Sequence, residues 1–131
     1  MAVINGFHHV ALKARDIEKS IAFYRNALGL KEKRRWGEGD GRAVMLDAGG
    51  GNILEVFAGG SGPKPDGALV HLAFRTADCD GMLAQARAAG AEVTVEPKSV
   101  QIPSNPPTPA RIAFCKGPDG EVIEFFQSDA L

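Results

Sequence analysis

Two histidines and two glutamates occupy matching places in the two halves of the chain. His9 lies 46 positions before Glu55, and His71 lies 53 positions before Glu124. Imidazole nitrogens and carboxylate oxygens suit divalent zinc, nickel, cobalt and iron, at bond lengths of about 2.0–2.2 Å. Two carboxylates also balance the charge of a divalent ion, which favours a partly buried site. Each residue alone is more simply explained as a solvated strand residue, but the matched set predicts a metal site.

Each half is predicted to fold as a strand, a helix and three further strands. The elements of the first half are Phe7–Ala14, the helix Ile17–Leu28, Lys31–Trp36, Ala43–Asp47 and Asn52–Phe57. Those of the second half are Leu69–Thr76, the helix Cys79–Ala89, Glu92–Pro97, Arg111–Cys115 and Val122–Gln127. We therefore expect one domain, residues 1–131, built from module one (1–61) and module two (68–131). An ordinary α+β domain whose halves match by accident does not explain the four matched residues.

Residues that flank these elements indicate where they begin and end. Asp16 and Asp78 precede the two helices as candidate N-caps, and Gly29 and Gly90 follow them where a helix ends on a left-handed residue. The longer His–Glu spacing of the second half is ascribed to an extra proline-rich loop, Ile102–Pro109, which has no counterpart in the first half. The linker between the modules is placed in the Gly- and Pro-containing segment 59–67.

Strand alternation places the four ligand candidates opposite the helices. In each strand the ligand candidate alternates with apolar neighbours that can pack under a helix. By the same rule Lys13 shares the face of His9, and Arg75 shares the face of His71. All four candidates are therefore predicted to project from the concave side of a curved sheet. His8 is predicted on the helix-packed side, as a satisfied edge or core histidine.

Other chemically capable residues have simpler explanations. Cys79 and Cys115 form no CxxC pair and are interpreted as buried, inert thiols, which favours a reducing compartment such as the cytoplasm. Trp36 and Phe57 suit either stacking on a substrate or packing in a core or interface.

Charge and hydropathy exclude several classes of partner. The 15 Lys and Arg residues nearly balance the 16 Asp and Glu residues, for a formal net charge of −1. This argues against binding through nucleic-acid phosphates, as does the absence of a basic run longer than Lys31–Arg35. No stretch approaches the roughly 20 apolar residues of a membrane helix, and the N-terminus lacks the pattern of a signal peptide. We expect a small-molecule substrate, with neither nucleic acid nor membrane as a partner.

These features resemble the vicinal oxygen chelate superfamily, which includes glyoxalase I. The resemblance spans nearly the whole chain. Its most specific parts are His9-Val10-Ala11-Leu12, the segment from Phe23-Tyr24-Arg25 to Leu28-Gly29-Leu30, Glu55 in Ile53-Leu54-Glu55, His71 in Val70-His71-Leu72, and Gly117-Pro118-Asp119-Gly120 leading to Glu124. The resemblance implies paired βαβββ modules that form a cupped, mostly antiparallel sheet around one metal, with the helices on the convex side. It also implies the His/Glu/His/Glu ligand set of glyoxalase I, namely His9, Glu55, His71 and Glu124.

The same resemblance implies a reaction. In glyoxalase I-like lyases a divalent metal, here nickel or zinc with cobalt, manganese or iron as alternatives, holds two adjacent substrate oxygens and stabilises an enediolate. A carboxylate moves the proton between neighbouring carbons. Glu124 is the candidate base, with Glu55 as the alternative or partner. The expected substrate is a 2-oxoaldehyde–thiol adduct or a related 2-hydroxycarbonyl compound.

The sequence departs from glyoxalase I where that enzyme grips glutathione. Lys13 stands at the position of the family's arginine, and 58–60 offers no side-chain amide at the position of its asparagine. Another thiol adduct is therefore an alternative substrate. Alternative functions are those of an epimerase or Fe(II) dioxygenase of the same superfamily, or of a non-catalytic small-molecule or drug-binding module. The resemblance also implies a homodimer, so the ligand pairs meet either within one chain or across two chains.

Overall fold

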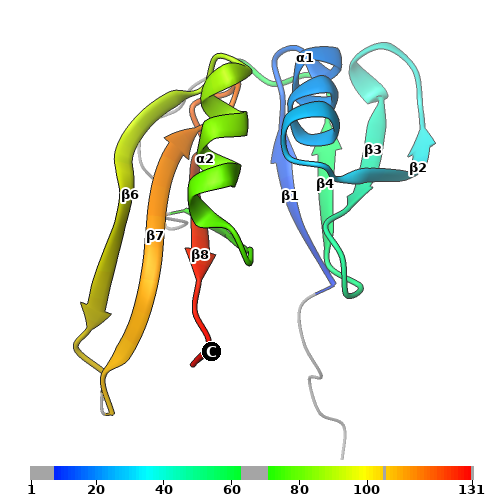
Figure 1. The fold of residues 1–131 in the computed structure, drawn as a ribbon. Helices are drawn as coiled ribbons and strands as arrows, with labels where there is room; N and C mark the ends of the chain where they lie inside the picture. The colour runs from blue at the N-terminus through cyan, green and yellow to red at the C-terminus, as the bar shows by residue number, and fades with distance from the viewer. Residues whose placement is uncertain (1–7, 63–70, 105, 131) are drawn as a thin grey trace, which may run out of the picture. The chain divides into compact units, whose positions relative to one another are not determined.

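The computed structural model describes residues 8–62, 71–104 and 106–130. The chain divides into two compact units, residues 1–62 and 63–131, each with its own helix and four-stranded sheet (Figure 1). Each unit has the predicted order of strand, helix and three strands. The α+β class and the paired βαβββ architecture are therefore confirmed.

The first unit contains one mixed sheet with strand order β1-β4-β3-β2. Its elements are β1 (His9–Lys13), α1 (Ile17–Ala22), η1 (Phe23–Ala27), β2 (Lys31–Trp36), η2 (Gly39–Gly41), β3 (Ala43–Asp47) and β4 (Ile53–Phe57). Strands β1 and β4 are parallel, whereas the β4–β3 and β3–β2 pairs are antiparallel. The sheet is thus mostly antiparallel, as predicted.

The second unit repeats this topology with strand order β5-β8-β7-β6. Its elements are β5 (Leu72–Arg75), α2 (Cys79–Ala88), β6 (Glu92–Ile102), β7 (Thr108–Lys116) and β8 (Val122–Gln127). Strands β5 and β8 are parallel, and the other two pairs are antiparallel. In both units, therefore, the first and last strands lie side by side at the same place in the sheet.

Each helix packs against its own sheet, and apolar side chains fill the space between them. In the second unit α2 contacts β6, β7 and β8, and Leu83 of α2 is buried together with Ile123 and Phe125 of β8. In the first unit α1 contacts β4, where Leu54 and Val56 are buried. Because side chains alternate along a strand, the residues between these apolar positions point away from the helix.

Both helices begin at the predicted caps. The Asp16 carboxylate accepts a hydrogen bond from the Lys19 backbone N–H at 3.1 Å, and the Asp78 carboxylate accepts one from the Gly81 N–H at 2.9 Å. These bonds satisfy N–H groups that the first helical turn leaves without a partner. Gly29 follows the first helical segment with φ +79°, in the left-handed region that favours glycine.

The first helical segment is not the continuous α-helix predicted over Ile17–Leu28. The α-helix ends at Ala22, and a π-helical turn covers Phe23–Ala27. The Leu28 N–H accordingly donates to the Phe23 carbonyl, five residues back, at 3.3 Å. Tyr24 within this turn is fully buried. Tertiary packing of the apolar face outweighs the local preference for an α-helical turn.

The proline-rich loop predicted over Ile102–Pro109 is shorter in the structure, where residues 103–104 and 106–107 lie outside the strands. β6 extends through Ile102, β7 begins at Thr108, and the two residues pair with each other. Pro97 is accommodated because the register shifts between Val95 and Lys98, and because β6 lies at the edge of its sheet. Longer strands on both sides of this loop therefore account for much of the greater His–Glu spacing of the second half.

Several other boundaries differ by a few residues. β1 spans His9–Lys13 and β4 begins at Ile53, so both strands are slightly shorter than predicted. β5 begins at Leu72, so His71 lies immediately before the strand rather than within it. The predicted strand residues 69–70 and most of the predicted linker lie outside the described residues. In the described part of the chain, no helix has the length and apolar character needed to cross a membrane.

Candidate metal centre

The first histidine–glutamate pair spans the parallel strands β1 and β4. His9 is in register with Ile53, and Ala11 is in register with Glu55, so both ligand candidates lie on the face opposite the buried Leu54 and Val56. The His9 Nε2 and Glu55 Oε1 atoms are 3.9 Å apart. The side chain of Glu55 is 9% exposed and that of His9 is 41% exposed. The imidazole is thus accessible, whereas the carboxylate is held in the sheet.

The second pair occupies the same place in the second sheet. Ala73 of β5 is in register with Glu124 of β8, and alternation puts His71 on the face of Ala73. The His71 Nε2 and Glu124 Oε2 atoms are 3.0 Å apart, which is hydrogen-bonding distance. The His71 ring also meets the Phe114 ring edge-on, with centroids 5.5 Å apart. The predicted face and the predicted pairing within each unit therefore agree with the structure.

Tight glycine turns bring the last strand of each unit into register. In the first unit the Ala48 N–H donates to the Asn52 carbonyl across Gly49–Gly51, and β3 and β4 pair from there to bring Met45 opposite Glu55. In the second unit the Gly117 N–H donates to the Glu121 carbonyl. The following β7–β8 pairing puts Phe114 opposite Glu124.

A larger residue at position 117 would require the Glu121 side chain to move. A Cβ at this position would lie 1.6 Å from the Glu121 Oε1 atom and 2.4 Å from its carboxyl carbon. The Gly-Pro-Asp-Gly segment is therefore the local signal that sets the register of Glu124. Gly120, which ends it, has φ +81° and donates to the Gly117 carbonyl at 3.0 Å.

Both glutamates are buried carboxylates with a histidine as their ion-pair partner. Among the described residues, neither Glu55 nor Glu124 lies within 4.0 Å of a lysine or arginine nitrogen. A buried carboxylate is costly without a compensating charge or hydrogen bonds. A divalent cation would supply that charge, and imidazole nitrogen with carboxylate oxygen is a donor set that such ions accept. The residues present thus fit a divalent metal.

Each unit brings together two of the four predicted ligands. Within the described ranges, the side chains of His, Cys, Asp and Glu form no cluster of three or more that could hold a metal ion. The two described pairs supply four donors in total, two from each unit. The complete four-ligand set remains a prediction.

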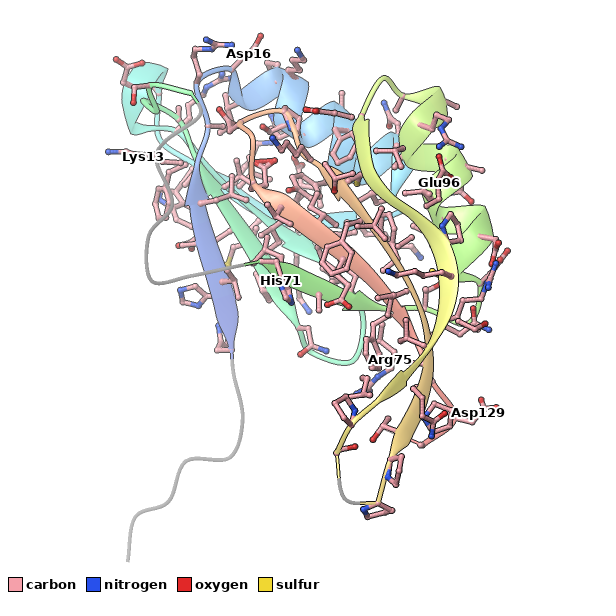
Figure 2. The ribbon with its side chains drawn as sticks, turned by 90° about the vertical axis from the view of Figure 1, so that its left-hand side faces the viewer. Lys13, Asp16, His71, Arg75, Glu96 and Asp129 are labelled. Carbon is pink, nitrogen blue, oxygen red and sulfur yellow. The ribbon has the colours of Figure 1, made fainter. Side chains whose placement is uncertain are left out.

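Lys13 and His8, the two other basic residues near His9, differ in whether the structure agrees with their predicted place. Lys13 ends β1 on the face of His9, is exposed, and extends outward from the strand (Figure 2). His8 was predicted on the helix-packed side, but it is exposed, and its Nδ1 atom lies 3.0 Å from the Nδ1 atom of His9. Val10, which shares the side of His8 by alternation, is also 37% exposed, so this end of β1 is not covered by the helix of its unit.

The two cysteines are buried free thiols, as predicted. Burial raises the pKa of Cys115 to about 11, and burial followed by the Asp80 carboxylate raises the pKa of Cys79. Both stay protonated at neutral pH and are poor nucleophiles and metal ligands. Trp36 is 46% exposed at the end of β2.

Sequence reasoning assigned no role to Arg75, although it placed this residue on the correct face. Arg75 follows His71 by four positions, as Lys13 follows His9, and it ends β5 as Lys13 ends β1.

Comparison with known proteins identifies one family, through both a family model and individual relatives. The model of the Glyoxalase/Bleomycin resistance protein/Dioxygenase superfamily matches residues 6–125. The lactoylglutathione lyase of Neisseria meningitidis is 31% identical over 126 residues, which cover 91% of this chain and 88% of that protein.

Solved structures of two relatives are also similar. The trypanothione-dependent glyoxalase I of Leishmania major has a TM-score of 0.74 at 25% identity, covering 97% of this chain and 89% of that one. TnmS3, an antibiotic-binding protein from Streptomyces sp. CB03234, has a TM-score of 0.74 at 25% identity, covering 98% of this chain and 100% of that one.

Proposed function

Because the chain belongs to the Glyoxalase/Bleomycin resistance protein/Dioxygenase superfamily, also called the vicinal oxygen chelate superfamily, we propose that it is a metal-dependent lyase or isomerase of the glyoxalase I type. The observation that carries this proposal is the repeated histidine–glutamate pair. Both carboxylates are buried, both face away from the helix of their unit, and both have an imidazole as ion-pair partner. The similarity to lactoylglutathione lyases supports the same assignment.

The two pairs together would hold one divalent ion through His9, Glu55, His71 and Glu124. Nickel or zinc suits this mixed nitrogen and oxygen set best, with cobalt, manganese and iron as alternatives. When bound, the ion would polarise substrate oxygens and stabilise negative charge that develops on them. We further propose that the two modules belong to one domain, and that the protein is a C2 homodimer. The pairs would then meet either within one chain or across the dimer.

Glu124 is proposed as the base. Its carboxylate would take the proton from the carbon next to the substrate carbonyl and return it to the neighbouring carbon. Two features of its surroundings support this role: the carboxylate is shielded from water, and the Phe114 ring faces it from the next strand. Glu55 would act chiefly as a ligand.

The proposed substrate is a 2-oxoaldehyde–thiol adduct or a related 2-hydroxycarbonyl compound. Lys13 would attract an anionic part of it, as a point charge rather than a bidentate fork. Since both cysteines are free thiols, we propose a reducing compartment, the cytoplasm, as the place of action.

A non-catalytic small-molecule-binding protein is the second candidate, favoured by the similarity to the antibiotic-binding protein TnmS3. Such a protein needs no base, so it would bind a ligand without turnover whether or not a metal is present. An epimerase or Fe(II) dioxygenase would instead show turnover that depends on a different substrate or on iron.

The test is an activity panel on protein reconstituted separately with nickel, zinc, cobalt or manganese. Methylglyoxal adducts of several thiols are supplied, and formation of the thioester is followed by its ultraviolet absorption. The proposal expects turnover with at least one metal and none after chelation. Absence of turnover with every metal and adduct, in protein that binds metal, would contradict it.

A further inference from the structure

The two ring nitrogens of His9 have different neighbours. The Nε2 atom of His9 is 3.9 Å from the Oε1 atom of Glu55, its partner in the first histidine–glutamate pair. The Nδ1 atom of His9 is 3.0 Å from the Nδ1 atom of His8, which is hydrogen-bonding distance. The two rings meet edge-on, with centroids 5.2 Å apart and planes at 89° to each other. The His9 ring therefore lies between a carboxylate and a second imidazole.

The contact with His8 bears on which nitrogen of His9 carries the proton. A neutral imidazole has one N–H donor and one acceptor nitrogen, and a metal binds only a nitrogen that has no proton. When the His9 Nδ1–H donates to the Nδ1 lone pair of His8, the Nε2 atom of His9 keeps its lone pair. The opposite donation would leave the proton on Nε2 and block that atom as a ligand. Metal binding at Nε2 is thus compatible with the first direction only.

The two units differ in how their glutamates act on this choice. The 3.9 Å between His9 Nε2 and Glu55 Oε1 is too long for a hydrogen bond, so Glu55 does not hold a proton on Nε2. The 3.0 Å between His71 Nε2 and Glu124 Oε2 is a hydrogen bond, which needs the proton on Nε2 when the carboxylate is ionised. The Nε2 proton of His71 has to leave before that nitrogen can bind an ion, whereas the geometry around His9 imposes no such step.

The backbone holds His8 beside the site although it lies outside β1. The Ile53 N–H of β4 donates to the His8 carbonyl at 3.2 Å, and Ile53 is also in register with His9. Both histidines are therefore fixed at the same end of the β1–β4 strand pair. Because His8 is exposed, its own Nε2–H can be donated to water while its Nδ1 accepts from His9.

The second unit cannot make the same hydrogen bond. Val70 precedes His71 as His8 precedes His9, and an aliphatic side chain has no atom that accepts a hydrogen bond. The His71 ring meets the Phe114 ring edge-on instead, with centroids 5.5 Å apart. A ligand candidate with a hydrogen-bonded neighbouring imidazole is therefore a feature of the first unit.

We propose that His8 is a positioning residue, which accepts a hydrogen bond from the Nδ1–H of His9 and so keeps the Nε2 atom of His9 free to bind a divalent ion. This inference rests on the proposed function and adds a residue outside the four ligands. A partner on the second nitrogen of a ligand histidine fixes its tautomer and ring orientation, and its loss lowers metal affinity about 10–100-fold. His8 itself neither binds the ion nor transfers a proton.

The first test measures the Kd for zinc by competition with a chromogenic chelator. His8→Ala leaves all four ligands in place, so it should still take up zinc to the wild-type stoichiometry at saturation. Its Kd should nevertheless rise about 10-fold, at the lower end of the usual range because water can reach both rings. His8→Asn should recover most of the affinity, because the amide Oδ1 can accept the same hydrogen bond.

Val10→Ala is the matched control. Val10 follows His9 as His8 precedes it and is also exposed, but its side chain offers no hydrogen bond to the ring. This variant should keep the wild-type Kd for zinc. A Kd for His8→Ala within twofold of wild type, in protein with a wild-type melting temperature, would overturn the proposal. An equal rise in His8→Ala and His8→Asn would do the same.

The second test reads the tautomer of His9 without metal, by ¹⁵N NMR of the imidazole nitrogens in mildly alkaline buffer. The wild-type and His8→Asn proteins should carry the His9 proton mainly on Nδ1, and His8→Ala should shift it toward Nε2. The same tautomer distribution in wild type and His8→Ala would refute the role of His8.

The two tests keep this inference separate from the proposed function. A wild-type protein that binds no divalent ion contradicts the proposed function, and the tautomer of His9 then decides the role of His8 alone. A wild-type protein that binds zinc, with an unchanged Kd in His8→Ala, contradicts this inference and leaves the proposed function standing.

Discussion

The two units have the same topology and the same register, yet their histidine–glutamate pairs differ in closeness. The nitrogen–oxygen distance is 3.9 Å between His9 and Glu55, and 3.0 Å between His71 and Glu124. The residue opposite the glutamate on the neighbouring strand is Met45 in the first unit and Phe114 in the second. A rigid aromatic ring contacts His71, whereas His9 contacts the exposed His8. The backbone register is thus the same in both units, whereas the side chains beside the two pairs differ.

A second difference lies at the outer hairpins. The β6–β7 hairpin is much longer than the β2–β3 hairpin and contains two register shifts, but the pairing of β5 with β8 matches that of β1 with β4. Extra length in the outer hairpin leaves the strand pair at the opposite edge of the sheet unchanged. The repeated site is therefore carried by the first and last strands of each unit.

The largest effect is expected on kcat, and it distinguishes the roles of Glu124 and Glu55. Glu124→Gln should keep metal better than Glu124→Ala, because the amide oxygen can still coordinate. It should nevertheless lose about 10²–10⁴-fold in kcat, since an amide cannot accept the proton. Glu55→Gln should reduce kcat less than Glu124→Gln when both variants contain the same amount of metal. Near wild-type turnover in Glu124→Gln together with an inactive Glu55→Gln would reverse the roles of the two carboxylates.

The next-largest effect is expected on the free energy of unfolding, in a comparison of the hydrophobic cores of the two units. Phe125→Ala in the second unit removes a fully buried ring and should lower the free energy of unfolding by about 3–5 kcal/mol. Val56→Ala in the first unit should cost less, because it removes only two methyl groups. If the modules form one domain, denaturant unfolding followed by circular dichroism will show one transition that both variants shift. Two transitions, each sensitive to one variant, would show that the modules unfold independently.

A smaller effect is expected at Lys13. Lys13→Ala should raise KM for an anionic adduct by up to about fivefold and change kcat less, because an exposed charge contributes little binding energy and contributes it uniformly. Lys19→Ala, an exposed lysine on α1, is the control and should leave both constants unchanged. A fall in kcat with unchanged KM would mean that Lys13 acts on the reacting atoms instead.

The smallest effect is expected at the cysteines. Burial holds the pKa of Cys115 at about 11, so its thiol stays neutral and shielded at pH 8, and Cys79 behaves alike. Labelling of the native protein with a chromogenic disulfide should be negligible at pH 8 and complete in denaturant. The thiolate fraction rises only as pH approaches the raised pKa. Rapid labelling of either thiol at pH 8 would show that its unit opens readily.

Local signals predicted much of the fold. The bounds of β2, β3 and β8 agree with the sequence prediction, because glycine-rich turns bracket short strands there. The two aspartate caps form the expected hydrogen bonds. Strand alternation also placed the four ligand candidates on the face opposite the helix of their unit, since it depends on local geometry alone.

The errors arose where tertiary structure outweighs local preference. The prolines between Ile102 and Pro109 indicated a loop that is longer than the observed one, because strand pairing extends β6 to Ile102 and begins β7 at Thr108. The π-helical turn at Phe23–Ala27 has three buried residues, and periodicity does not distinguish it from an α-helical turn. The two His–Glu distances depend on side-chain conformation, which no spacing in the sequence gives.

The central claim is that the two pairs act as one metal site, and metal content tests it most directly. Elemental analysis of the purified wild-type protein should give about one divalent ion per pair of modules. His71→Ala and Glu55→Gln, which alter different units, should each lose most of that metal, whereas His8→Ala should retain it. Stoichiometric metal in both the His71→Ala and the Glu55→Gln proteins would contradict the account.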